Sequence, residues 1–90
     1  MEKLKEEAEE ILNLLKLAKT DEEFYDLGER CDQLWRKHQA NDNLDPWDGS
    51  FLSDCRMFCY SVPDKDDQED RDEEHNNAII SIKNYISIFH

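Results

Sequence analysis

Apolar residues recur at intervals of three and four along most of this chain. In residues 2–18 the repeating positions are Leu4, Ala8, Ile11, Leu15 and Ala18, with Leu12, Leu14 and Leu17 beside them. This spacing puts the apolar side chains on one face of a helix, which must then pack against a neighbouring element. The pattern predicts a first helix over residues 2–18 with this face buried.

A capping-box pattern follows directly. Thr20 and Glu23 have the spacing at which each side chain pairs with the backbone N–H of the other residue at a helix start. We expect a second helix over residues 21–39, ending where Asn41–Asn43 favour a loop. Because the connection is short, the first two helices should be antiparallel neighbours. The expected core positions of the second helix are Phe24, Leu27, Cys31, Leu34 and Trp35.

Pro46 and Gly49 disfavour helix between residues 41 and 50, so this stretch is predicted to be a structured loop. Trp47 lies at its centre, and its ring is expected to cover the core, since Trp is usually mostly buried. A third helix should run over residues 50–62 and end before Pro63. Its apolar face would contain Leu52, Cys55, Cys59 and Val62, with Phe51 and Phe58 beside it.

The last segment predicts a fourth helix over residues 67–88. Its isoleucines at 80, 82, 86 and 88 alternate as in a strand, but a lone strand would leave its backbone groups unpaired. Helix is therefore the expectation. Its apolar half would consist of Ile79, Ile82, Ile86 and Phe89, with Ala78 and Tyr85 adjacent.

Together these elements predict an all-α, four-helix bundle-like fold with residues 1–90 as a single domain. Ninety residues leave no room for a second core. No run approaches the roughly 20 apolar residues that a membrane-spanning helix needs, and the first residues are acidic and amphipathic, unlike the apolar run that is typical of a signal peptide. Three cysteines, an odd number, fit a reducing compartment. We therefore expect a cytoplasmic protein without a membrane partner.

Charge narrows the choice of partner. The chain has 23 acids against 11 bases, a net charge of −12, which repels nucleic acids and anionic membranes. A basic protein surface is the expected partner, with no direct binding of nucleic acid. Half of the net charge comes from residues 64–75, which contain Lys65, Arg71 and eight acids: Asp64, Asp66, Asp67, Glu69, Asp70, Asp72, Glu73 and Glu74.

In a helix this run contains repelling pairs four residues apart, such as Asp66–Asp70 and Glu69–Glu73, and Asp67–Arg71 is the one attractive pair. A repulsive surface favours partner binding, and the alternative is a solubilising face. Trp47 and Asp48 add an alternative to a core-covering ring, because a large aromatic among carboxylates can act as a binding anchor when it fills a pocket of a partner. The predicted partner-binding residues are Asp64, Asp66, Asp67, Glu69, Asp70, Glu73, Trp47 and Asp48.

No residue pattern indicates catalysis. Around Cys31, Cys55 and Cys59 the sequence shows neither a general base nor an orienting group, and there is no glycine-rich phosphate loop. Cys55 and Cys59 are one helical turn apart and Cys31 could approach them, but a structural zinc site usually has four closely spaced ligands. We expect three buried thiols, no metal or cofactor, and no enzymatic activity.

The segment from Glu22 to Phe89 resembles the small immunity proteins that neutralise tRNA-cleaving toxins of the colicin D and contact-dependent inhibition type. The similarity lies in Glu23-Phe24, in Phe51-Leu52 through Phe58-Cys59-Tyr60 into Val62-Pro63-Asp64, and in the acids followed by an isoleucine-rich helix. The resemblance implies a helical bundle whose acidic surface plugs the basic active site of a nuclease. Asp64, Asp66 and Asp67 would then occupy that site.

The expected function is therefore that of an acidic immunity protein occluding a toxin nuclease. Two alternatives stay open. A phage-encoded nucleic-acid mimic that blocks a host defence complex such as CRISPR-Cas would use the same charge, and genes beside it would discriminate the two. A helical adaptor or assembly subunit would instead use the leucine-rich first helix, and would self-associate with little dependence on salt.

Overall fold

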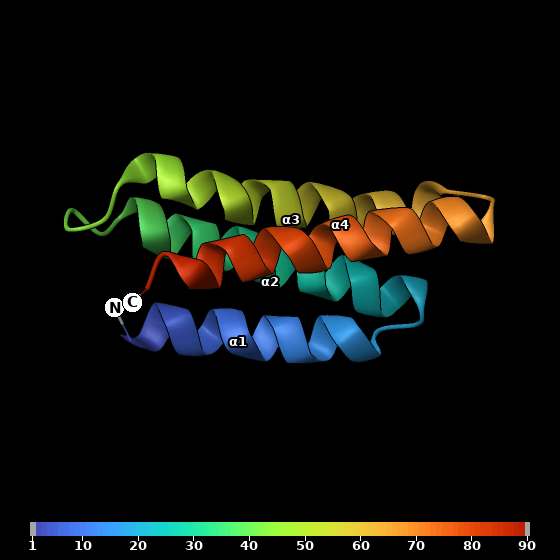
Figure 1. The fold of residues 1–90 in the computed structure, drawn as a ribbon, viewed down its shortest axis with the longest axis horizontal. Helices are drawn as coiled ribbons and strands as arrows, with labels where there is room; N and C mark the ends of the chain where they lie inside the picture. Colours follow the sequence, from blue (N-terminus) through green and yellow to red (C-terminus); the bar gives the residue numbers. More distant parts are fainter. Residues whose placement is uncertain (1, 90) are drawn as a thin grey trace.

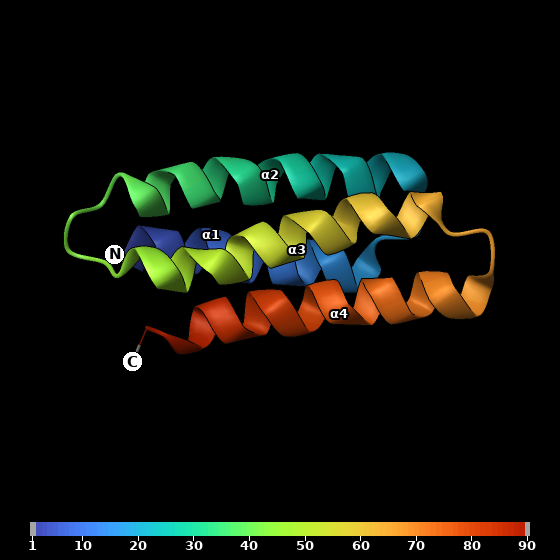
Figure 2. The same cartoon turned by 90° about the horizontal axis from the view of Figure 1, so that it is seen from above.

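A computed structural model describes residues 2–89 of the chain. Within them the α-helices form one antiparallel bundle that measures 41 × 19 × 18 Å (Figures 1 and 2). Each helix packs against the next along the chain, and the last closes the ring against the first. The elements are α1 (Glu2–Leu17), α2 (Asp21–Gln39), η1 (Pro46–Gly49), α3 (Ser50–Ser61), η2 (Val62–Asp64) and α4 (Gln68–Ser87), where η denotes a short 3-10 helix.

The helices confirm the predicted all-α fold, with bounds within one residue of the predicted ones. The capping box at the start of α2 is present, since Thr20 accepts from the Glu23 N–H and Glu23 accepts from the Thr20 N–H. The isoleucine-rich segment is one continuous helix, and no part of residues 2–89 forms a strand. Backbone pairing within the helix therefore outweighs the strand preference of isoleucine.

The predicted apolar faces meet in one core. Every face contributes its central positions, so that sixteen apolar residues are buried, including Leu4, Ala8, Ile11, Leu15, Phe24, Leu34, Leu52 and Ile82. In α4 the buried positions are Ala78, Ser81, Ile82 and Tyr85, while Ile79, Ile86 and Phe89 pack at the margin. The centre of the α4 face is thus rotated from the prediction, because the large Tyr85 side chain fills the interior.

Three predictions about burial are wrong. Leu14 and Leu17 were expected to widen the buried face of α1, but they are 42% and 72% exposed, and they line a shallow surface hollow together with Glu23, Asp26 and Arg30 of α2. Trp47 was expected to cover the core and is instead 83% exposed. Its loop is structured as predicted, but η1 turns the indole ring outward. Trp35, also expected in the core, is only partly buried.

A buried histidine holds the loop between α2 and α3 against the bundle. His38 Nε2 lies 2.8 Å from the Asp45 carbonyl oxygen, and Nδ1 lies 3.0 Å from the Tyr85 hydroxyl of α4. Burial, and next the charge of Asp48, raises the pKa of Tyr85 to about 12, so this hydroxyl keeps its proton. Tyr85 therefore donates to Nδ1, and Nε2–H donates to the Asp45 carbonyl.

The connections divide between the two ends of the bundle. The α1–α2 and α3–α4 connections lie at one end, and the α2–α3 loop with Trp47 lies at the other (Figure 1). Among the described residues, no helix is both long and apolar enough to cross a membrane.

Candidate functional site

Carboxylates from two helix starts gather at one end of the bundle. We call this the acidic end and define it as the acids of residues 64–74 together with Asp21, Glu22 and Glu23. The first group leads into α4 and the second forms the first turn of α2. Both helices begin here because alternate helices of an antiparallel bundle start at the same end. Seven of the eight acids in residues 64–74 are exposed, and Glu74 is half-buried.

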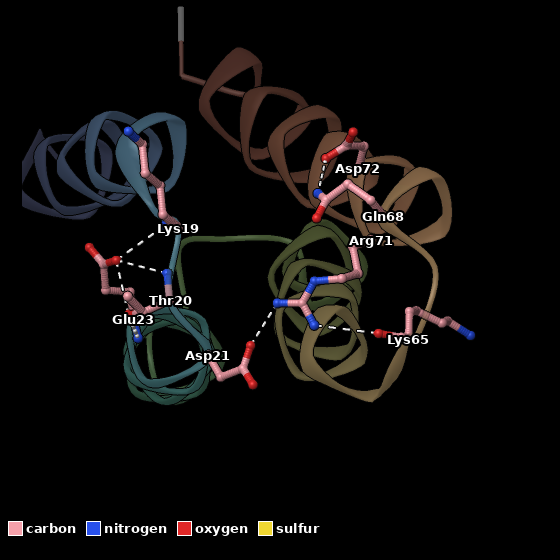
Figure 3. Close-up of polar contacts among 8 residues, drawn as sticks. All are labelled: Lys19, Thr20, Asp21, Glu23, Lys65, Gln68, Arg71 and Asp72. Carbon is pink, nitrogen blue, oxygen red and sulfur yellow. Dashed lines mark hydrogen bonds and ion pairs between the residues drawn. The ribbon is translucent and has the colours of Figure 1, made fainter.

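Some of these acids have a local structural role. Asp67 is the N-cap of α4 and accepts from the Glu69 N–H at 3.2 Å. Glu69 and Asp70 lie in the first turn, where the helix dipole favours negative charge. Asp72 accepts from the Gln68 side chain at 2.8 Å (Figure 3). The start of α4 therefore gives a structural reason for about half of the acids in residues 64–74.

Arg71 is turned away from the run. The expected Asp67–Arg71 pair does not form, because Asp67 is used as the cap. Arg71 instead reaches across to α2 and donates to Asp21 Oδ1 at 2.6 Å and to the Lys65 carbonyl oxygen at 3.4 Å (Figure 3). This ion pair ties the starts of α2 and α4 together. The one arginine of the segment therefore neutralises an acid of α2.

The remaining carboxylates have no internal counter-charge. Of the five ion pairs within residues 2–89, none includes an acid of the run. Asp64 precedes α4, Asp66 precedes its cap, and Glu73 lies beyond its first turn. All three are exposed. Because they lie outside the cap and the first turn of α4, the start of this helix does not require their negative charge. They form the part of the acidic end that is available to a partner.

A hollow of about 290 Å³ opens beside this end, between α1, α2 and α4. Its polar lining comes from Lys19, Gln68, Arg71, Asp72 and His75, and three apolar side chains form its floor. His75 Nε2 lies 2.6 Å from the Leu15 carbonyl oxygen, which joins α4 to α1 at this point. The hollow has the size for one partner side chain, and the Asp72 carboxylate is part of its lining.

Trp47 and Asp48 lie at the opposite end of the 41 Å bundle (Figure 1). The structure therefore does not bring them together with Asp64, Asp66, Asp67, Glu69, Asp70 and Glu73. Asp45 caps η1 by accepting from the Trp47 N–H at 2.9 Å, and the Gln39 side chain donates to the Pro46 carbonyl at 3.2 Å. Asp48 is half-buried. Hydrogen bonds from two directions thus hold the backbone that carries the exposed indole.

The structure also assembles a group that the sequence left scattered. The Sγ atoms of Cys31, Cys55 and Cys59 all lie within 4.8 Å of one another, and all three residues are fully buried. Interaction with the neighbouring Cys31 thiol, and next with the Cys55 thiol, lowers the pKa of Cys59. Hydrogen bonding with Cys31 and Cys59, together with burial, raises the pKa of Cys55. Only the Cys55–Cys59 spacing was visible as a signal in sequence.

An apolar patch lies on the outside of α1. Leu14 and Leu17, with Leu27, line a shallow hollow of about 420 Å³ whose charged rim contains Glu23, Asp26 and Arg30. Large exposed apolar side chains side by side are uncommon on a monomer surface and often mark contact sites. The patch is therefore a second candidate surface.

Comparison with family models, with curated proteins and with solved structures found no match to this chain. The resemblance to toxin immunity proteins therefore stays a prediction.

Proposed function

We propose that this protein is an acidic inhibitor that docks its acidic end into the basic active-site groove of a toxin nuclease. The carboxylates would take the place of substrate phosphates and pair with Lys, Arg or His side chains of the nuclease. Occlusion of the groove would then neutralise the toxin without any chemical step.

The observation that carries this proposal is the lack of internal counter-charge for Asp64, Asp66 and Glu73. These acids repel their neighbours in the free protein, and neither a cap nor an ion pair of the described residues offsets the repulsion. A basic groove would relieve it on binding. Charge of this kind chiefly accelerates association, by steering the two surfaces toward each other.

Apolar contacts would supply the slow dissociation. The hollow beside the acidic end has an apolar floor of Ala18, Phe24 and Val62, which a partner side chain could cover. Water would be excluded there while the surrounding carboxylates pair with basic groups. Desolvated contacts at the centre of an interface usually dominate the binding free energy.

The test is inhibition of tRNA cleavage by purified nuclease domains of the colicin D and contact-dependent inhibition types. The wild-type chain should inhibit a cognate domain, and the triple variant Asp64→Asn, Asp66→Asn, Glu73→Gln should associate at least about tenfold more slowly. A matched control neutralises three exposed acids elsewhere, Glu6→Gln, Glu9→Gln and Glu29→Gln. Equal loss in both variants would indicate a general effect of net charge and would contradict the proposal.

The same surface would suit a nucleic-acid mimic directed at a DNA- or RNA-binding complex. The two readings differ in the partner, not in the residues used. Inhibition of such a complex, with no effect on any toxin nuclease domain, would favour the mimic.

A specific observation supports a third reading, that of an assembly subunit. Leu14 and Leu17 are exposed together on α1, where a second apolar helix face could cover them. The variant Leu14→Glu, Leu17→Glu should then remove self-association in light scattering and sedimentation. A wild-type chain that is monomeric from low to high concentration would exclude this reading.

A further inference from the structure

Three thiols from two helices meet at one point in the interior of the bundle. Cys31 comes from α2, while Cys55 and Cys59 are one turn apart in α3. The Cys31 thiol donates to Cys55 Sγ at 3.3 Å, and all three sulfurs lie within 4.8 Å of one another. Sulfurs that share one ion at about 2.3 Å lie roughly 4 Å apart. Small rotations of the three cysteine side chains would therefore be enough for all three sulfurs to bind one central atom.

The number of ligands limits what this site can hold. Within residues 2–89 the group of possible ligands at this point contains these three sulfurs and no fourth member. His75 of α4 acts electrostatically on Cys59, but its Nε2 lies 2.6 Å from the Leu15 carbonyl oxygen. A structural zinc ion takes four protein ligands, so the three sulfurs alone leave its coordination incomplete. A soft centre that takes three ligands fits better.

The net charge of the complex decides which of these centres fits, because the interior of the bundle is apolar. Three thiolates keep one negative charge around Zn²⁺ and two around Cu⁺, whereas with trivalent arsenic the complex is neutral. A net charge in an apolar interior is costly. We propose that Cys31, Cys55 and Cys59 form a binding site for trivalent arsenic, which they hold as a neutral complex with three sulfur ligands.

The reaction needs no oxidant or reductant. Arsenous acid carries three hydroxyl groups, and each thiol replaces one of them. An As–S bond forms, an As–O bond breaks, and the thiol proton leaves with the hydroxyl group as water. The arsenic stays trivalent and three waters are released. Because arsenous acid is itself neutral, the strongly negative surface of the protein does not repel it.

Access requires local opening of the α2–α3 contact, since the thiols are not exposed. Such opening is slower than diffusion but occurs in all folded proteins. Binding should therefore be slow, and mild urea that promotes local opening should accelerate it. A site on the surface would show neither behaviour.

The experiment uses the reduced full chain and sodium arsenite. Native mass spectrometry should show one arsenic atom bound with the loss of three protons, and X-ray absorption should show three As–S bonds. The thermal midpoint should rise with arsenite concentration, as expected for a ligand of the folded state. Zn²⁺ should give a smaller rise at the same concentration.

Variants distinguish loss of a sulfur ligand from a general loss of stability. Cys31→Ala, Cys55→Ala and Cys59→Ala should each weaken arsenite binding by about 100-fold or more, through loss of one linked ligand. Tyr85→Phe, which weakens the bundle elsewhere, should keep the three As–S bonds. Arsenic held by two sulfurs, unchanged affinity in a folded Cys→Ala variant, or tighter binding of Zn²⁺ would each overturn the proposal.

Discussion

Individual side chains fix the two ends of this bundle through buried or capping hydrogen bonds. At the Trp47 end, His38 joins three segments, because its ring bonds both the Tyr85 hydroxyl of α4 and the Asp45 carbonyl of the loop. No buried polar side-chain atom among the described residues is left without a partner. Removing one member of such a set leaves another unsatisfied, which costs more than the lost bond itself.

The first prediction concerns Tyr85. Tyr85→Phe leaves the buried His38 Nδ1 without a donor, so the free energy of unfolding should fall by about 1–3 kcal/mol. Urea unfolding followed by circular dichroism would measure it. Tyr25→Phe is the control, because Tyr25 is 44% exposed, and should change stability by no more than about 0.5 kcal/mol. Equal effects of the two changes would mean that the buried hydrogen bond contributes nothing.

The second prediction separates two neighbouring acids of the run. Asp67→Ala removes the cap of α4 and should lower the free energy of unfolding by about 1 kcal/mol. Asp66→Ala changes an exposed acid outside the helix and should alter stability by less than about 0.5 kcal/mol. Thermal unfolding of both variants checks this. The effects on affinity should have the opposite order: Asp66→Ala should weaken binding to the nuclease more than Asp67→Ala, if Asp66 contacts the nuclease and the capping residue Asp67 does not.

At the scale of the helix, the start of α2 shows how a local motif responds to pH. Glu23 accepts from the N–H groups of Thr20 and Lys19, and these bonds, that of Thr20 first, lower its pKa below the ordinary value of 4.5. The ionised side chain is therefore favoured in the folded state. Its contribution to stability is fully present above pH 4.5 and is lost as the pH falls through the lower folded-state pKa.

The third prediction follows from the lowered pKa of Glu23. Glu23→Gln should be less stable than Glu22→Gln at pH 7, although both variants lose the same charge. The difference between them should shrink as the pH falls below 4.5 and through the lowered pKa of Glu23, because its carboxylate then becomes protonated. Thermal midpoints measured across this pH range test it. A constant difference at all pH values would show that the ionised carboxylate is not what holds the cap.

At the scale of the whole molecule, the bundle separates two surfaces that the sequence presents within thirty residues of each other. Trp47 lies at one end and the acidic run at the other, because α3, with η1 before it and η2 after it, lies between them along the bundle (Figure 2). A partner of ordinary interface size that covers the acidic end would therefore leave the indole uncovered. Trp47 and the acids are independent candidates.

The fourth prediction uses this separation. Trp47→Ala should keep the stability within about 0.5 kcal/mol, since the side chain is 83% exposed, and should leave nuclease affinity unchanged. Raising the salt concentration should slow association of the wild-type chain, because screening weakens steering. Surface plasmon resonance at two ionic strengths measures both. Loss of affinity in Trp47→Ala alone would move the interface to the opposite end.

The sequence by itself determined the four helices, their bounds to within one residue and most of the core positions of the first three, since apolar periodicity, caps and Pro are local signals. It also located the acid run. Only the tertiary structure decided that Arg71 pairs with Asp21, that Leu14, Leu17 and Trp47 face outward, and that Cys31 meets Cys55 and Cys59. These features depend on how the helices are rotated and aligned against one another. Packing sets that geometry through contacts between residues far apart in the chain, for which no local pattern exists.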